Sequence, residues 1–198
     1  MIEEAVAALR AGEPVVLPTD TVYGLAADAR NEEAVRGLYR LKGRAEPQPT
    51  AIIAADVDAL VEAVPELHGL PLLTGPYTLI LPNPEGRFPW LTGGRPDTIG
   101  VRVPDLPRDA LEVVRRLGVV AATSANLPGG PDPRSVADIP QQLLADSAAV
   151  VDAGELPGTP STVIDLTGPE PVVVREGAVA ATEALSRVSA AAASRDSA

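Results

Sequence analysis

The chain has 198 residues and no cysteine, which excludes thiol catalysis, cysteine-ligated metal centres and a disulfide framework. It carries 27 acidic and 16 basic residues, a formal net charge of −11, so phosphate backbones are repelled at long range and general nucleic-acid binding is excluded. The single histidine, His68, rules out zinc sites built on two histidines.

The start of the chain does not resemble a secretory signal, because Glu3 and Glu4 stand where a basic region would be needed. The longest uncharged stretch, residues 67–84, contains four prolines and two glycines, which predicts a loop–strand–loop and not a membrane span. Together with the lack of cysteine, this indicates a cytoplasmic protein that does not contact the membrane.

Short apolar runs rich in β-branched residues alternate with amphipathic stretches along the chain, which is typical of an α/β domain. We expect residues 1–185 to form this domain and the Ala/Ser-rich residues 186–198 a tail that frays after about Val188. In chain order, the patterns predict a helix at 2–11, strands at 14–17 and 22–26, a helix at 31–43, a strand at 51–55, a helix at 56–64, strands at 77–81 and 99–103, a helix at 106–117, a strand at 119–123, an interrupted helix at 135–145, strands at 149–152, 161–166 and 171–175, and a helix from 178.

Polar residues follow several of these strands. Thr19 to Thr21 follow the first strand, Ser124 and Asn126 follow the strand at 119–123, and Ser161 begins another. In open α/β sheets ligands bind beyond the strand ends, where such groups can converge. The same residue types also make ordinary turns, and for any one loop taken alone the turn is the more common explanation.

A basic cluster lies at the end of the helix at 31–43 and consists of Arg36, Arg40, Lys42 and Arg44. Arg40 and Lys42 could simply complement the helix dipole, but Arg44 lies beyond its reach. Lys42 is the only lysine in a chain with 15 arginines, which suggests that a compact ammonium is needed there, as when a point charge approaches a phosphate.

The strand at 99–103 places Gly100 and Arg102 on one face. Because glycine leaves space beside it, Arg102 could bind a carboxylate through two hydrogen bonds. It could equally be an arginine at the rim of a sheet that pairs with an internal aspartate. Arg175, at the end of the last predicted strand, presents the same choice.

The absence of two common nucleotide-binding motifs further limits the kinds of reaction that the protein could catalyse. The chain has neither a G-x-x-x-x-G-K-[ST] phosphate loop nor a G-x-G-x-x-G dinucleotide motif. A site without cysteine, and with its one histidine in an exposed loop, would work by holding charged reactants with arginine, lysine, hydroxyls and Mg²⁺. Phosphoryl and nucleotidyl transfer can proceed in this way.

Five motifs resemble, in order and spacing, those of the YrdC-type family of threonylcarbamoyl-AMP synthases, in the single-domain, TsaC-like form without a linker and second domain. The resemblance covers roughly residues 2 to 185. The motifs are Pro18 to Leu25, Lys42-x-Arg44, Ser124 to Asn126, Pro160 to Asp165, and Arg175 to Gly177.

This resemblance implies a twisted mixed β-sheet with flanking helices and an open concave binding face, the YrdC/RibB-like fold. It also implies a reaction that converts L-threonine, bicarbonate and ATP to L-threonylcarbamoyl-AMP and pyrophosphate, with Mg²⁺ bound to the ATP. The product would be used for the t6A modification of tRNA at position 37. Proteins that transfer the threonylcarbamoyl group would accept the product, and a weak contact with double-stranded RNA or tRNA is a further expectation. No tightly bound cofactor or metal is implied.

The resemblance also assigns roles to individual residues. Matched motif by motif, the threonine site would be lined by Thr21, Arg102, Ala122 and Ser161, with Arg102 binding the carboxylate. The nucleotide site would be lined by Arg44, Gln48, Thr98, Ser124, Asp132 and Arg175. The polar group around the phosphates would consist of Lys42, Arg44, Ser124 and Asn126.

The sequence departs from the family pattern at two informative places. Ala45 follows Arg44 where proline is usual, and Ile53 stands where histidine is common. Two other functions are compatible with the same fold. The protein would then be an RNA- or ribosome-binding paralogue without synthase activity, or a related carbamoyl-adenylate-forming enzyme that uses carbamoyl phosphate.

Overall fold

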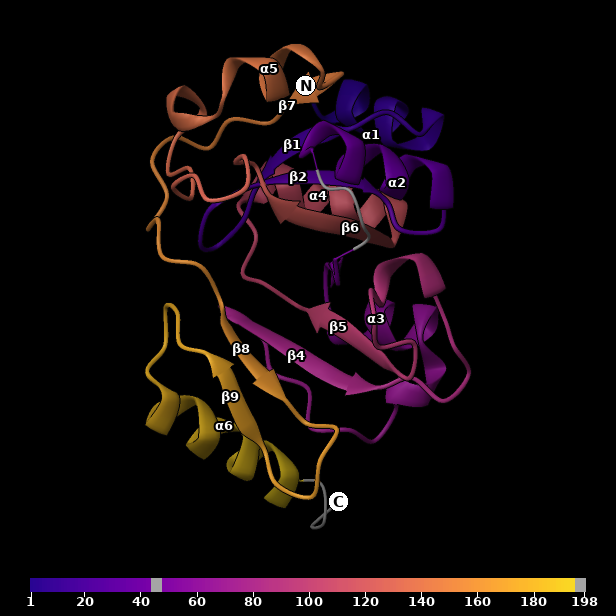
Figure 1. The fold of residues 1–198 in the computed structure, drawn as a ribbon, viewed down its shortest axis with the longest axis vertical. Coiled ribbons are helices and arrows are strands. Elements are labelled where there is room, and N and C mark those ends of the chain that lie inside the picture. Colours follow the sequence, from indigo (N-terminus) through magenta and orange to yellow (C-terminus); the bar gives the residue numbers. More distant parts are fainter. Residues whose placement is uncertain (44–47, 195–198) are drawn as a thin grey trace.

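The structure is a computed structural model that describes residues 1–43 and 48–194. Its helices and strands alternate along the chain, as the apolar patterns predict (Figure 1). The α-helices are α1 (Ile2–Ala11), α2 (Glu32–Leu41), α3 (Val57–Ala63), α4 (Arg108–Leu117), α5 (Gln141–Ala145) and α6 (Ala181–Ala193), and short 3₁₀ turns are η1 (Pro65–Leu67), η2 (Pro89–Leu91) and η3 (Val136–Asp138). The strands are β1 (Val15–Pro18), β2 (Tyr23–Asp28), β3 (Ala51–Ala54), β4 (Tyr77–Pro82), β5 (Thr98–Arg102), β6 (Val119–Ser124), β7 (Ala149–Val150), β8 (Thr162–Asp165) and β9 (Val172–Arg175).

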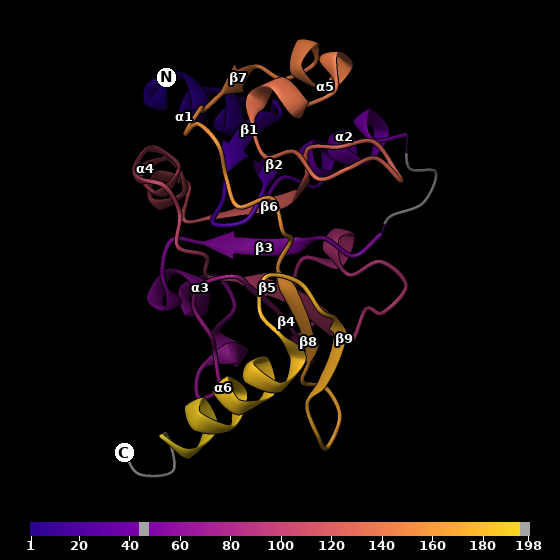
Figure 2. The same ribbon diagram turned by 90° about the vertical axis from the view of Figure 1, so that its left-hand side faces the viewer.

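These strands form one mixed sheet in the order β7-β1-β2-β6-β3-β5-β4-β8-β9. The pairs β1–β7, β3–β5 and β4–β8 are parallel, and the other neighbours are antiparallel. Strand direction turns progressively from β1 to β9, so the sheet is strongly twisted (Figures 1 and 2). The predicted α/β class with a twisted mixed sheet and flanking helices is confirmed.

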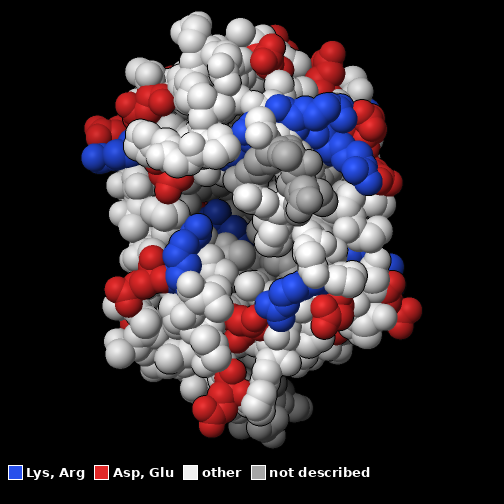
Figure 3. Space-filling view, in the orientation of Figure 1, with Lys and Arg blue, Asp and Glu red and all other residues white. Residues whose placement is uncertain are grey.

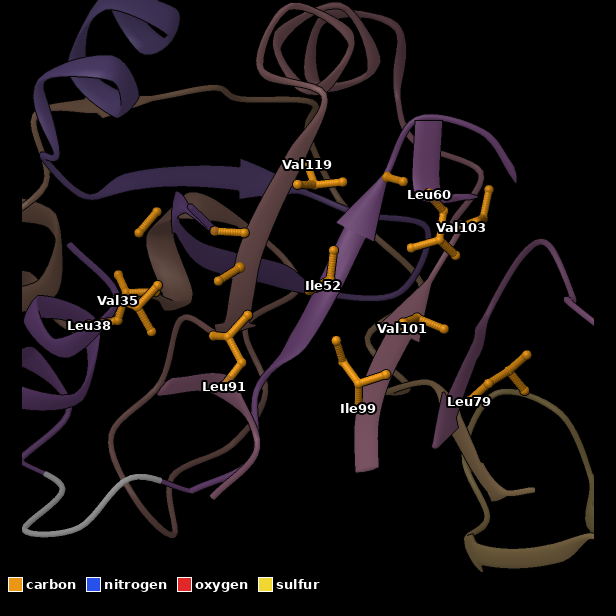
Figure 4. Packing of buried hydrophobic residues seen from close by; sticks show 14 of the residues in the cluster. Val35, Leu38, Ile52, Leu60, Leu79, Leu91, Ile99, Val101, Val103 and Val119 are labelled. Carbon is orange, nitrogen blue, oxygen red and sulfur yellow. The ribbon is translucent and has the colours of Figure 1, made fainter. Parts of the chain in front are cut away.

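One face of the sheet is covered along its length by apolar packing against α2, α3 and α6. Figure 4 shows Ile52, Val101 and Leu79 from three neighbouring strands, which are aligned in register as partners across β3, β5 and β4. Leu38 of α2 and Leu60 of α3 belong to the same buried cluster. Burial of this apolar layer favours folding by about 25 cal/mol per Å² of apolar surface removed from water.

The opposite face is covered only in part. Helices α1 and α4 pack together over a second apolar cluster that includes Ala26, Ile53 and Val120. Because alternate residues of a strand share a face, Ala122 and Ser124 lie on the same side as Val120, further along β6. Ala122 and Ser124 are only partly buried, so this end of the face is less covered than the part under α1 and α4.

The end of α2 sets the direction of the chain at Lys42. Asn31 caps the helix by accepting a hydrogen bond from the Ala34 amide at 3.1 Å. The helix ends at Leu41, and Gly43 has a φ of +63°, a left-handed conformation that glycine adopts without strain. Its amide donates to the carbonyl of Arg40 at 2.9 Å, which turns the backbone sharply after Lys42.

The C-terminal prediction is wrong in one respect. Helix α6 continues to Ala193, and Val188 is buried against the sheet instead of marking the start of a frayed tail. Alanine has the highest helix propensity, so the Ala-rich composition extends the helix here. Within the described residues, we find no helix of sufficient length and apolarity to cross a membrane.

Candidate active site

A cavity of about 630 Å³ opens on the uncovered part of the sheet, between the ends of strands that are distant in sequence. Figure 3 shows this hollow in the middle of the face, with basic side chains at its edge, which are arginines because the one lysine of the chain is buried. Nine of the predicted site residues line it: Thr21, Gln48, Thr98, Arg102, Ala122, Ser124, Asp132, Ser161 and Arg175.

Strand register explains why these residues converge. Ala51 of β3 is the partner of Ala122 on β6, and Gly100 of β5 is the partner of Ile80 on β4. Val163 of β8 pairs with Arg175 on β9, so six strands contribute residues to the lining of the cavity. Gly100, without a side chain, forms part of the floor and leaves the space next to Arg102 open.

Lys42 lies behind this cavity and does not line it. Only 1% of the residue is exposed, and its Nζ donates to the Ser124 carbonyl at 2.5 Å and to Asn126 Oδ1 at 3.0 Å, with a longer contact of 3.4 Å to Thr123 Oγ1. Lys42 is thus a buried cation that holds the turn after β6, and the approach of its ammonium to a phosphate stays a prediction.

The same network fixes the polar edge of the cavity. Asn126 Oδ1 also accepts from Ser124 Oγ at 2.7 Å, and its Nδ2 donates to the Gly130 carbonyl at 2.9 Å and to Asp132 Oδ1 at 3.2 Å. Lys42, Ser124, Asn126 and Asp132 thus form one connected unit from three segments of the chain. The fourth predicted member of the polar group, Arg44, lies outside the described residues.

The basic cluster on α2 is largely neutralised. Arg36 pairs with Glu32 at 2.7 Å and Arg40 pairs with Glu33 at 2.7 Å, both on the surface of the same helix. The two acids come directly before the cluster in sequence and reach back along the helix face. With Lys42 buried, α2 does not present a continuous basic stripe.

Arg102 combines the two interpretations that its sequence pattern allowed. Its Nη2 donates to Asp20 Oδ1 at 2.8 Å, so it does pair with an internal aspartate, yet it also lines the cavity. Burial lowers the pKa of Arg102, which Asp20 opposes, and burial raises the pKa of Asp20, which Arg102 opposes. Arginine is effectively always protonated in proteins, so Arg102 is a cation.

Hydroxyl groups complete this end of the cavity. Thr21 Oγ1 accepts from Arg102 Nη2 at 3.3 Å and lies 2.9 Å from Thr19 Oγ1. Across the cavity, Ser161 Oγ lies 2.8 Å from Thr78 Oγ1, and Arg175 Nη2 donates to the Ser161 carbonyl at 2.8 Å. Arg175 therefore anchors the strand that carries Ser161 as well as lining the cavity.

The segment between β7 and β8 is tied to the first motif by Tyr23. The buried Tyr23 hydroxyl contacts Asp152 Oδ1 and the Gly154 carbonyl, both at 2.8 Å, and accepts from the Ala153 amide at 3.0 Å. Further along, the Gly158 amide donates to the Thr21 carbonyl at 2.8 Å. These bonds hold the approach to Ser161 against the β1–β2 turn.

We expect Tyr23→Phe to lower the free energy of unfolding by about 1–3 kcal/mol, because buried partners of the hydroxyl lose their hydrogen bonds. Urea denaturation measures the change. Tyr77→Phe is the matched control, since the Tyr77 hydroxyl makes no hydrogen bond within the described chain, and it should change stability by less than about 0.5 kcal/mol. Equal losses in the two variants would contradict this role of Tyr23.

Sequence reasoning missed several lining residues. Arg95 comes from the loop before β5, where its guanidinium pairs with Asp165 at 2.8 Å and donates to Thr167 Oγ1 at 3.1 Å. The two-residue alternation of β4 could have identified Thr78, which shares a face with Ile80. Nothing local marks Arg95, because its position depends on an ion pair 70 residues away.

Ile53, where the family often has histidine, is buried and is the register partner of Arg102 across β3 and β5. The departure thus places an apolar side chain on the strand position next to the cavity arginine. Gln48 is exposed at the edge of the cavity, close to the residues that are not described.

Fold and site together define an α/β protein that gathers arginines, hydroxyls and a buried lysine around an open cleft in a mixed sheet. A family model for Sua5, YciO and YrdC proteins, described as "Telomere recombination", matches residues 7–177. The chain belongs to this Sua5/YciO/YrdC family, which confirms the resemblance of its five motifs.

Named relatives cover nearly the whole chain. A protein of Bacillus subtilis named threonylcarbamoyl-AMP synthase is 37% identical over 187 residues, 90% of this chain and 54% of the relative. A putative threonylcarbamoyl-AMP synthase of Mycobacterium tuberculosis (strain H37Rv) is 36% identical over 193 residues, 94% of this chain and 88% of the relative.

Among solved structures, the crystal structure of Pyrococcus abyssi Sua5 complexed with L-threonine superposes with a TM-score of 0.80 and 35% identity, covering 94% of this chain and 56% of that one. This chain therefore spans about half the length of the Bacillus and Pyrococcus proteins and most of the mycobacterial one.

Proposed function

We propose that the protein is a threonylcarbamoyl-AMP synthase, which converts L-threonine, bicarbonate and ATP to L-threonylcarbamoyl-AMP and pyrophosphate. The observation that carries this proposal is that Arg102, Ser161, Ser124 and Asp132, which the family resemblance assigns to the two substrates, all line one cavity. Its relatives, and the L-threonine in the Pyrococcus structure, supply the substrate class.

The proposed reaction needs electrostatic help more than acid–base chemistry. The amine of threonine and bicarbonate form a carbamate, with loss of water. A carbamate oxygen then attacks the α-phosphorus of ATP, the bond from that phosphorus to the bridging oxygen breaks, and pyrophosphate leaves with the electron pair. Both partners are anions, so cations that reduce their repulsion and a cleft that orients them lower the barrier.

In this scheme, the residues that line the cavity are divided between the two substrates. Arg102 binds the threonine carboxylate, with Thr21, Ala122 and Ser161 around the amino acid. The nucleotide, which brings Mg²⁺ as part of the substrate, lies toward Ser124. Its other proposed neighbours are Arg44, Gln48, Thr98, Asp132 and Arg175.

Lys42 contributes a fixed positive charge next to Ser124, because its Nζ donates to the Ser124 carbonyl. Its second hydrogen bond, to Asn126 Oδ1, holds the Ser124–Asn126 turn in place. A buried cation is screened less than a surface one, so its potential extends into the cavity although its hydrogen bonds go to the protein. The product would then supply proteins that modify adenosine 37 of tRNA. The ion-paired state of α2 gives no support to a direct RNA contact.

The test is to incubate the pure protein with ATP, Mg²⁺ and bicarbonate, with and without L-threonine, and to detect products by mass spectrometry. We expect threonylcarbamoyl-AMP and pyrophosphate only when threonine is present. In a parallel incubation with carbamoyl phosphate in place of bicarbonate and threonine, formation of carbamoyl-AMP would identify the carbamoyl-adenylate enzyme instead. Salt-sensitive retention of double-stranded RNA with no turnover would favour the RNA-binding paralogue.

A further inference from the structure

Asp20 is a buried carboxylate next to the cavity that the proposed reaction does not use directly. It lies in the turn between β1 and β2, its side chain is 9% exposed, and it is absent from the cavity lining, which Arg102 reaches. We infer that Asp20 is a positioning residue and internal counter-ion that sets the affinity of Arg102 for the carboxylate of the amino-acid substrate. This inference rests on the proposed function.

Hydrogen bonds define how Asp20 holds the guanidinium. Oδ1 accepts from Arg102 Nη2 at 2.8 Å, and Oδ2 accepts from the Asp105 amide at 3.3 Å, so both carboxylate oxygens are engaged. Arg102 Nη2 is also within 3.3 Å of Thr21 Oγ1. The guanidinium is therefore fixed from the β1–β2 side.

Asp20 and Thr21 contact only Nη2 of Arg102, so other donors of the guanidinium remain available. Its Nε is buried and has no hydrogen-bond partner in the described part of the chain. A buried donor without a partner is costly, and a carboxylate entering the cavity can satisfy it. Because Asp20 occupies Nη2, the ligand would bind through the remaining N–H groups of the fork.

Asp20 then has two opposite effects on the substrate. As a hydrogen-bond acceptor it orients Arg102, which favours binding. As a second anion beside the same guanidinium it neutralises the charge and repels an incoming carboxylate, which weakens binding. The balance keeps the affinity for amino acid moderate, so that the product, which retains the carboxylate, can leave.

Two substitutions separate these effects. Asp20→Asn keeps an oxygen acceptor for Nη2 and removes the charge, so the calorimetric Kd for L-threonine should fall about tenfold. Asp20→Ala removes both, which frees the guanidinium to move, so Kd should rise about tenfold or more. The KM for ATP should change less than about twofold in both, since the effect is local to Arg102.

Asp105→Asn is the matched control, because Asp105 is an exposed carboxylate that neighbours the pair through its backbone. It should leave the Kd for threonine within about twofold. Thermal denaturation checks that each variant is folded. If Asp20→Ala does not fold, Asp20→Ser replaces it, because the serine side chain is too short to reach Arg102.

Any pattern other than tighter binding in Asp20→Asn and weaker binding in the truncated variant overturns the inference. Wild-type protein that gives no heat with L-threonine removes the proposed function and this inference together. Wild-type binding with unchanged variants removes the inference alone and leaves the proposed function standing.

Discussion

Lys42→Met should reduce the rate of threonylcarbamoyl-AMP formation by about 100-fold or more, as loss of one preorganised electrostatic group does in other enzymes. The substitution keeps an unbranched chain of similar length but removes the charge behind Ser124. It also leaves the Ser124 carbonyl without its 2.5 Å donor, so the turn that carries Ser124 and Asn126 loses its anchor. Pyrophosphate release at saturating ATP and threonine measures the effect.

The same variant should lower the free energy of unfolding by about 1–3 kcal/mol, because buried acceptors lose their donor. Arg36→Met is the matched control: Arg36 is a cation on the exposed side of α2, paired with Glu32, and its loss should change both activity and stability little. Wild-type activity in folded Lys42→Met would refute the role assigned to the buried ammonium.

Arg102→Met should remove saturable dependence on L-threonine and also destabilise the fold by roughly 3–5 kcal/mol, because it leaves the buried Asp20 carboxylate without its cation. Arg95→Met is the matched control, since Arg95 also lines the cavity but forms a half-exposed pair with Asp165. Arg95→Met should lower the free energy of unfolding by about 1 kcal/mol or less, and the reaction should still depend on L-threonine.

The pH dependence of this variant follows from Asp20. Burial already raises the pKa of Asp20, and losing Arg102 removes the main influence that lowers it. A carboxyl whose pKa is raised by folding favours the folded state when protonated, so the deficit should be smallest below about pH 4 and grow as the pH rises through the raised value. A deficit that does not change between pH 4 and 8 would contradict a buried, unpaired carboxylate.

Much of the fold could be predicted because its signals are local. Alternating apolar runs defined the strands, and Asn31 and Gly43 marked the ends of α2. Some lining residues were predictable for a related reason: strand ends carry Ser124 and Ser161, and alternation places Arg102 on the face of Gly100. Others, such as Thr98 and Asp132, were expected only from the family resemblance.

Long-range pairing was not predictable from the same patterns. Asp20 and Arg102 are 82 residues apart, and their ion pair is one half of the arrangement in which Arg102 combines the two interpretations that the strand pattern left open. The direction of Lys42 depends on acceptors in the turn after β6, more than 80 residues away. The pairing of Arg36 and Arg40 with Glu32 and Glu33 is local, by contrast, and the spacing of these residues along α2 could have predicted it.

The most direct test of the account is a crystal structure of the protein with L-threonine and a non-cleavable ATP analogue bound together. We predict both ligands in the one cavity, with the amino-acid carboxylate at Arg102 and the phosphates facing Ser124. Ligands bound on separate surfaces, or an analogue whose phosphates point away from the Ser124–Asn126 turn, would contradict it.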